Sequence, residues 1–189
     1  MKSLKELLIQ YQAGDAEEQV YLDHIKNFLE RTDAAAALSR SNPEGHITAS
    51  SFVMNRSGTK ALLLYHAALR KWVQPGGHIE PTDASILAAA LREAEEETGI
   101  HCAAVHDGIF DVDVHEIPAN LEKNEPAHLH LDIRFLLKAG NEEVALSAES
   151  VSAQWVSLTD ASAFATASLE RMRRKCLAMK AAERFITKG

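Results

Sequence analysis

The sequence has little cysteine and no long apolar run. Its only cysteines, Cys102 and Cys176, lie far apart and show no CxxC or Cys/His spacing, so we expect reduced structural thiols and neither a disulfide nor a zinc site. No stretch approaches the roughly 20 apolar residues of a membrane-spanning helix. The first residues, MKSLKELLIQYQ, lack the apolar run and cleavage site of a signal peptide. A cytoplasmic protein without a membrane partner is therefore expected.

Basic residues are also too few for a general nucleic-acid-binding surface. Lys and Arg number 20 against 27 Asp and Glu, which gives a formal net charge of -7. A sequence-independent grip on nucleic acid needs a basic footprint, so we exclude it. An acidic protein can still bind a polyphosphate when divalent cations lie between its carboxylates and the ligand.

The length favours one domain with added helices. A chain of 189 residues can bury one substantial core but is short for two domains. Residues 3–31 carry apolar residues at helical intervals, which predicts two amphipathic helices separated near Gly14. We divide the chain into a helical N-terminal extension, 1–45, packed on the core, and a main domain, 46–189. The extension is either a cap or dimer arm, or simple packing against the core.

The main domain alternates between strand and helix patterns. The predicted strands are 47–54, 61–65, 109–117, 128–137 and 151–156, with a hairpin turn at 55–58. The predicted helices run from about 84 to 98, where Gly99 ends the first, and from 168 to 186. The segment Gln74-Pro75-Gly76-Gly77 is expected to be irregular. This order predicts an α/β fold, with a mixed sheet and helices packed on it.

Acidic residues gather on the first of these helices. At about 100° per residue, Glu93, Glu96 and Glu97 fall within roughly a third of its circumference. Their charges repel and oppose the helix dipole, and no lysine follows within reach. A hard cation, Mg²⁺ or Mn²⁺, could neutralise them, although a solvated helix face is the competing interpretation. The preceding Arg92 and the upstream Gly-Gly turn favour a site.

The segment from Gly76 to Ile100, GGHIEPTDASILAAALREAEEETGI, resembles the Nudix box. That pattern is glycine, five residues, glutamate, seven residues, then Arg-Glu-hydrophobic-any-Glu-Glu-any-Gly-hydrophobic. The second half matches at every specified position: Arg92, Glu93, Ala94, Glu96, Glu97, Gly99 and Ile100. Counted from Gly77, the first half departs, because Asp83 replaces the glutamate and eight residues separate it from Arg92. An added residue in the loop leaves the helical register intact.

The resemblance implies a Nudix α/β/α sandwich and attack by water on a diphosphate linkage. The implied substrate is a nucleoside diphosphate linked to another group, such as a nucleoside triphosphate, ADP-ribose or a nucleotide-sugar. The implied ligands of Mg²⁺ or Mn²⁺ are Glu93, Glu96, Glu97 and the main-chain carbonyl of Gly77, with Arg92 holding Glu93. The family takes its general base from the box or from a distant loop. Glu149 is a candidate, with an exposed loop glutamate as the alternative.

Two alternating runs place further polar residues on one sheet face. Strand alternation puts His128, His130, Asp132 and Arg134 on one face of the later strand, and Asp111, Asp113 and His115 on one face of the earlier. These residues could line the substrate cleft or a second metal site. An exposed sheet face is the competing interpretation.

Two other functions compete with hydrolysis. Some Nudix relatives are nucleotide sensors without catalysis, but such proteins would be expected to lose the acidic residues that are all present here. Isoprenoid diphosphate isomerisation would need cysteine chemistry, and Cys102, directly after the box, does not resemble that nucleophile. The substrate and the oligomeric state stay open, with a homodimer through the helical ends as one outcome.

Overall fold

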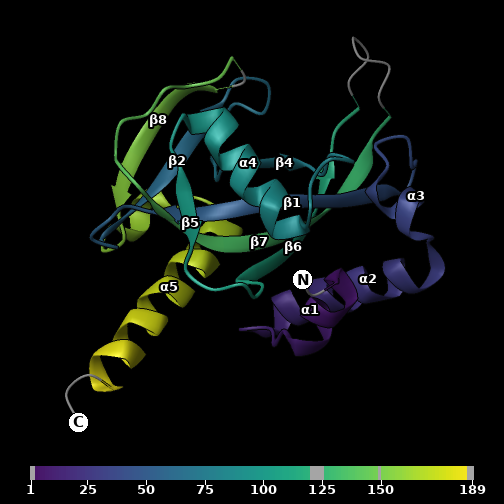
Figure 1. The fold of residues 1–189 in the computed structure, drawn as a ribbon, viewed down its shortest axis with the longest axis horizontal. Helices are drawn as coiled ribbons and strands as arrows, with labels where there is room; N and C mark the ends of the chain where they lie inside the picture. Colours follow the sequence, from purple (N-terminus) through teal and green to yellow (C-terminus); the bar gives the residue numbers. More distant parts are fainter. Residues whose placement is uncertain (1–2, 120–125, 149, 187–189) are drawn as a thin grey trace.

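The computed structural model describes residues 3–119, 126–148 and 150–186, and only the backbone of 183–186. Figure 1 shows a central sheet with helices around it. The elements, in order, are α1 (Leu4–Gln10), α2 (Ala16–Arg31), α3 (Ala34–Leu38), β1 (Gly45–Met54), β2 (Lys60–His66), β3 (Lys71–Val73), β4 (Gly76–His78), α4 (Ile86–Thr98), β5 (Cys102–Ala104), β6 (Asp111–Ile117), β7 (His128–Ala139), β8 (Ser150–Ser157), a 3-10 turn (Ala161–Ala163) and α5 (Ala167–Ile186). The predicted α/β class is confirmed.

The eight strands form one mixed sheet. At its centre β1 and β7 run parallel, with Gly45 opposite Leu129 and Met54 opposite Lys138. All other pairs are antiparallel: β1 with β2 and β4, β7 with β5 and β6, and β2 with β3 and β8. The predicted hairpin between β1 and β2 is therefore confirmed.

One expectation about the sheet is wrong. The Gly-Gly segment was expected to be irregular, yet Gly76 and Gly77 belong to strand β4, which pairs with β1 opposite Ser50 and Ala49. A side chain on Gly76 would collide with Ser50, since a Cβ there would lie 2.2 Å from the Ser50 Oγ. Glycine is thus what lets this strand approach β1 so closely.

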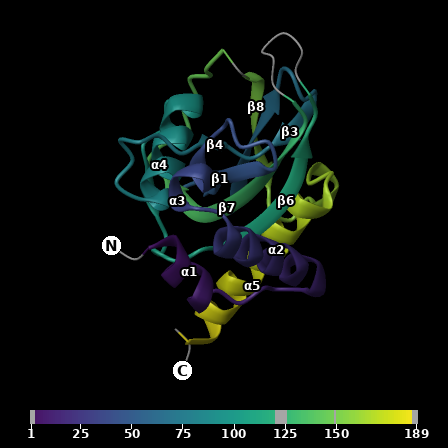
Figure 2. The same cartoon turned by 90° about the vertical axis from the view of Figure 1, so that its right-hand side faces the viewer.

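Apolar side chains fill both faces of the sheet. Along β1, Ile47 and Val53 join a core shared with α1, α2 and α4, whereas Phe52 and Met54 join a second core shared with α5. Figure 2 shows α4 and α5 on opposite sides of the sheet. Both cysteines are buried and free. Within the described residues, no helix is long and apolar enough to cross a membrane.

Helix α2 packs directly on the sheet. Leu22 and Phe28 of α2 are buried in the same core as the sheet. The Glu18 carboxylate is fully buried and accepts hydrogen bonds from the main-chain N–H of Gly14 and Val112 and from the Tyr11 hydroxyl. It also pairs with Lys175 of α5. These contacts are the ones that the packing interpretation of the extension requires.

Candidate active site

Helix α4 is fixed at both ends. The Ser85 side chain caps its first turn by accepting a hydrogen bond from the N–H of Ala88. Gly99 ends it in the left-handed conformation, with φ of 68°. The buried face carries Ala90 and Ala94, whose small side chains let the helix lie close to β1. The acidic face consequently has a defined position relative to β4.

Arg92 joins the loop before α4 to the acidic face. Its Nε and Nη2 donate to the two carboxylate oxygens of Asp83, at 3.0 and 2.8 Å. Nη2 also donates to the main-chain carbonyl of His78, at 2.8 Å. Nη1 donates to Glu93 at 3.0 Å and to Glu96 at 2.9 Å. Arg92 therefore relieves part of the repulsion between the glutamates. From the sequence alone, a bound cation was expected to provide all of this neutralisation.

Asp83, the residue at which the first half of the box departs from the pattern, is bound by Arg92. Its side chain is 6% exposed, and the hydrogen bonds from Arg92 lower the pKa of its carboxyl against the opposing effect of burial. A carboxylate gripped by both arms of a guanidinium is among the stronger polar contacts in proteins. Asp83 thus ties the loop before α4 to the helix.

Glu97 and Glu93 turn toward β4, and Glu96 lies at the rim. Glu97 is 8% exposed and accepts a hydrogen bond from the N–H of Gly76 at 2.8 Å. The Glu93 carboxylate is so close to Gly77 that a Cβ on this glycine would meet it at 2.6 Å. The side chain of Glu96 is 58% exposed. By contrast, Glu95 points to His101, at 3.1 Å, outside this group.

The donor set around β4 suits a hard divalent cation. Carboxylate and carbonyl oxygens are the ligands that Mg²⁺ and Mn²⁺ prefer. Mg²⁺ commonly binds through one or two carboxylates and completes its shell with water and substrate phosphate, without a full protein cage. Glu93 and Glu97, beside Gly76 and Gly77, could provide such a partial shell. Glu149, the proposed base, lies outside the described residues.

The polar residues of β6 and β7 form one sheet face with β1. The register aligns them in rows across the strands: His115, His130 and His46; Asp113, Asp132 and Thr48; Asp111, Arg134 and Ser50. Asp111, Asp113, Asp132 and Arg134 are at most 6% exposed. The competing interpretation, an exposed sheet face, therefore does not hold for these four residues. Ser168 and Arg171, in the first turns of α5, bind Arg134 and Asp111, and Glu17 of α2 pairs with Arg171.

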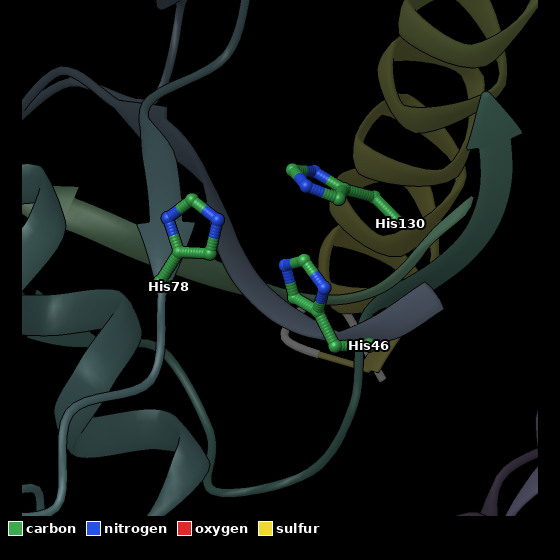
Figure 3. Close-up of side chains that lie close together, drawn as sticks. All are labelled: His46, His78 and His130. Atoms are coloured by element: carbon green, nitrogen blue, oxygen red, sulfur yellow. The ribbon is translucent and has the colours of Figure 1, made fainter. Parts of the chain in front are cut away.

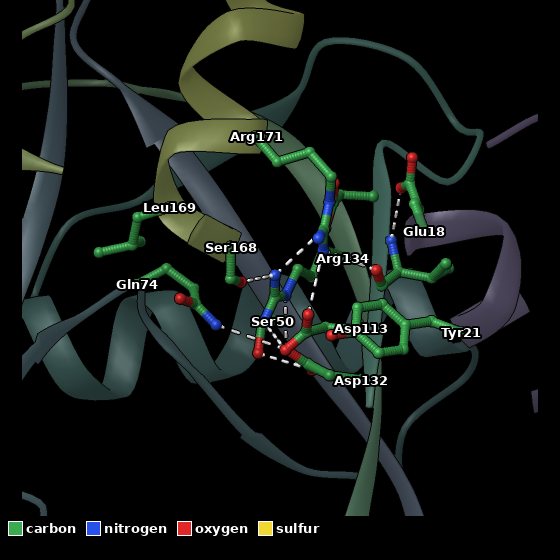
Figure 4. A network of polar contacts seen from close by, with 12 residues as sticks. Glu18, Tyr21, Ser50, Gln74, Asp113, Asp132, Arg134, Ser168, Leu169 and Arg171 are labelled. Carbon is green, nitrogen blue, oxygen red and sulfur yellow. Dashed lines mark hydrogen bonds and ion pairs between the residues drawn. The ribbon is translucent and has the colours of Figure 1, made fainter. Parts of the chain in front are cut away.

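Arg134 is the centre of this buried network (Figure 4). It donates to Asp111 at 3.1 Å, to Asp113 at 3.0 Å and to Asp132 at 2.8 Å. Arg171 of α5 pairs with Asp111 and Asp113, at 2.9 and 3.0 Å. Burial would raise the pKa of Asp113, but the nearby Arg134 and hydrogen bonds from His115 and Arg171 hold it well below its usual range. All four of these groups thus have internal partners, and their predicted substrate contacts remain predictions.

Histidines occupy the other end of the same face. The rings of His128 and His130 lie 5.2 Å apart between centroids, and each lies close to His46, at 5.1 and 4.8 Å. His78 completes the group at 5.1 Å from His46 (Figure 3). Burial and the neighbouring rings lower the pKa of His46 to about 4 and that of His130 to about 2, so these two rings are neutral at pH 7.

Sequence reasoning missed His46 and His78. From the sequence, no role was assigned to His46, at the start of the main domain, or to His78, within the box. The alternation His46, Thr48, Ser50 along β1 was the available signal, because it places three polar side chains on one strand face. Nothing in the sequence indicated that this face would meet that of β7.

The comparisons with known proteins agree on one family. A model described as a NUDIX domain matches residues 44–177. A relative from Lactococcus lactis subsp. cremoris, named "Probable DHNTP pyrophosphohydrolase", is 33% identical over 132 residues, which cover 70% of this chain and 76% of the relative. The "Uncharacterized Nudix hydrolase NudL" of Escherichia coli is 64% identical over 31 residues, 16% of each protein.

Solved structures share the fold. An Ap4A hydrolase of C. elegans, solved as a binary complex, is 24% identical, with a TM-score of 0.56, over 72% of this chain and 98% of that one. A MutT protein from Methanosarcina mazei Go1 is 25% identical, with a TM-score of 0.53, over 72% of this chain and 96% of that one. In both comparisons the matched region spans nearly all of the solved structure and 72% of this chain.

Proposed function

Because this chain belongs to the Nudix family of hydrolases, we propose that it cleaves a diphosphate linkage in a small nucleotide-like substrate with the acidic face of α4. The observation that carries the proposal is the contact between this face and β4. Glu97 accepts from the N–H of Gly76, and Glu93 lies against Gly77. The two carboxylates therefore lie beside the Gly-Gly segment, which supports a site there for a cation shared with a substrate phosphate.

We assign Glu93, Glu96, Glu97 and the Gly77 carbonyl as the groups that hold Mg²⁺ or Mn²⁺. Nudix hydrolases generally depend on a divalent metal ion, which neutralises the diphosphate and acidifies a bound water. Arg92 keeps Glu93 and Glu96 aligned through its Nη1, while its other nitrogens anchor it to Asp83. Arg92 is therefore a positioning residue, and the glutamates act through the cation.

The substrate class is the part that the comparisons guide least. The Lactococcus relative is named for DHNTP, so we propose DHNTP beside nucleoside triphosphates, ADP-ribose and nucleotide-sugars as candidates. His128 and His130 remain the proposed substrate contacts on β7, since both are partly exposed. Glu149 remains a proposed general base.

A substrate panel with a matched pair of variants tests the proposal. Release of phosphate or pyrophosphate is measured in Mg²⁺ or Mn²⁺ for the wild type, Glu97→Gln and Glu95→Gln. Glu97→Gln should lose on the order of 10²-fold or more in kcat, as expected when a charged group is removed from an active site. Glu95→Gln removes the same charge from the same helix but outside the site, so its activity should stay near wild type.

Two outcomes would contradict the proposal. Equal losses of kcat in both variants would mean that activity depends on the total charge of the helix and not on the position of Glu97 in the site. No turnover on any substrate, with nucleotide binding retained, would instead support the nucleotide-sensor alternative.

A further inference from the structure

We propose that His46, His78 and His130 bind a divalent transition-metal ion of the Zn²⁺ class at a site separate from the carboxylates of α4. The three residues come from β1, β4 and β7, and each offers a ring nitrogen within 4.8 Å of the others. Figure 3 shows the three rings turned toward a common space. In the described part of the chain, this is the one group of three potential metal ligands gathered so closely.

His46 supplies an independent reason to expect a ligand. Its side chain is 1% exposed, and neither Nδ1 nor Nε2 has a hydrogen-bond partner. A buried polar atom without a partner destabilises the folded state, and native proteins contain few of them. Coordination through one of these nitrogens would satisfy a lone pair that the protein leaves unused.

The donor chemistry selects the kind of ion. Neutral imidazoles suit Zn²⁺, Cu²⁺ and Ni²⁺, whereas Mg²⁺ prefers oxygen. Zn–N bonds of about 2.0–2.1 Å in tetrahedral geometry require the three nitrogens to draw closer than their present spacing. His78 and His130 are only partly buried, and their rings would turn toward His46 on binding the ion. Three protein ligands would leave a fourth position for water or a substrate group.

The surrounding residues are arranged to support such a site. His115 stacks edge-on to His130, at 5.6 Å between centroids, and its Nδ1 lies 3.1 Å from the Asp113 carboxylate, which fixes that ring. The carbonyl of His78 accepts a hydrogen bond from Arg92. The histidine site and the Nudix box therefore meet at β4, but they use different side chains and different donor atoms.

Zinc binding by the full chain tests this proposal without reference to catalysis. Zn²⁺ is titrated by calorimetry in the presence of millimolar Mg²⁺, which occupies oxygen sites. We expect one Zn²⁺ per chain, and at least tenfold weaker binding in His46→Gln, since even supporting partners of metal ligands contribute 10- to 100-fold. His101→Gln is the matched control, because this side chain is 87% exposed and pairs with Glu95, which is not part of the cluster.

A second pair of measurements separates failure of the site from failure of the fold. His130→Gln replaces a less buried ligand and should weaken binding as His46→Gln does. Glu97→Gln, which removes a carboxylate of the box, should leave Zn²⁺ binding unchanged while activity falls. Co²⁺ added to the wild type should give the visible spectrum of a nitrogen-ligated tetrahedral ion, absent in His130→Gln. Zn²⁺ binding that survives both histidine variants, or that disappears in Glu97→Gln, would overturn the proposal.

Discussion

At the scale of the single residue, Arg92 shows how one side chain can organise a site without taking part in its chemistry. Its guanidinium reaches the loop through Asp83, strand β4 through the His78 carbonyl, and the acidic face through Glu93 and Glu96. Arginine presents several donors in a rigid planar fork, which a lysine ammonium cannot reproduce. The role of this residue is consequently geometric as well as electrostatic.

Arg92→Lys should therefore be far from conservative. The variant keeps the positive charge but loses most of the shared hydrogen bonds, so Asp83, with a side chain 6% exposed, would lack its main partner. We expect a stability loss of about 1–3 kcal/mol and at least a tenfold fall in kcat with a smaller change in KM. Urea unfolding and steady-state kinetics measure the two effects.

Arg40→Lys provides the comparison. Arg40 is 58% exposed and makes a single ion pair with Glu80 at 3.4 Å, which is worth no more than about 1 kcal/mol. Its replacement should leave both measurements near the wild-type values. Similar effects of the two substitutions would mean that the fork of Arg92 has no special role.

At the scale of the elements, the sequence predicted what periodicity can encode. The helix at 84–98 was placed within two residues of its observed start at Ile86, and the hairpin turn at 55–58 was correct. The strands β3, β4 and β5 were missed, since runs of three residues show no period. The pairing of β1 with β7 could not be predicted either, because it is set by packing between segments far apart in the chain.

The candidate site divides in the same way. The acidic face of α4 follows from helical spacing and was predicted with its Arg92 partner. The buried network of Arg134 was recognised as a polar strand face but not as an interior one, because alternation does not show what covers the face. The histidine cluster needed the register of β1 against β7, which places His46 opposite His130.

The close approach of β4 to β1 leads to a further prediction. Gly76→Ala would place a methyl group 2.2 Å from the Ser50 Oγ and 2.6 Å from its Cα, so the strand must move away from β1. We expect a loss of roughly 1–3 kcal/mol in the free energy of unfolding, typical of overpacking. Activity should fall as well, because the N–H of Gly76 holds Glu97.

Gly108→Ala is the control for that substitution. A Cβ on Gly108 would find its nearest neighbour, His106 Nδ1, at 3.4 Å, which is ordinary contact. The same chemical change there should alter stability by less than about 1 kcal/mol. Thermal unfolding and turnover of the two variants, compared side by side, test whether the close approach of β4 matters.

At the scale of the whole molecule, buried charges connect parts of the chain that no single core joins. Arg171 of α5 reaches Asp111 and Asp113 on β6 and also Glu17 on α2. Lys175 connects α5 to Glu18 in the same way. The N-terminal extension, the sheet and the last helix thereby share one network of ion pairs. Loss of the network would weaken the packing of all three on one another.

The network should make the stability of the protein depend on pH at acid values. The pKa values of Asp111 and Asp113 are lowered in the folded state, where Arg134 and Arg171 outweigh the opposing effect of burial. At and below about pH 3.9, the pKa of an aspartate in the unfolded chain, the unfolded chain binds protons at these carboxylates and the folded chain does not. The stabilisation is thus complete above about pH 5 and is lost progressively as the pH falls toward about 2.

Urea unfolding between pH 7 and pH 3 measures this dependence, with Asp113→Asn as the test. At pH 7 the variant should lose about 3–5 kcal/mol, since it leaves buried guanidinium groups without one carboxylate partner. Its further loss on acidification should be smaller than that of the wild type, because one of the two responsible carboxylates is gone. Asp107→Asn, which removes an exposed carboxylate, should change stability by no more than about 0.5 kcal/mol. If Asp113→Asn declined with pH as steeply as the wild type, Asp113 would not be a source of the acid sensitivity, and the ion network would matter only for packing.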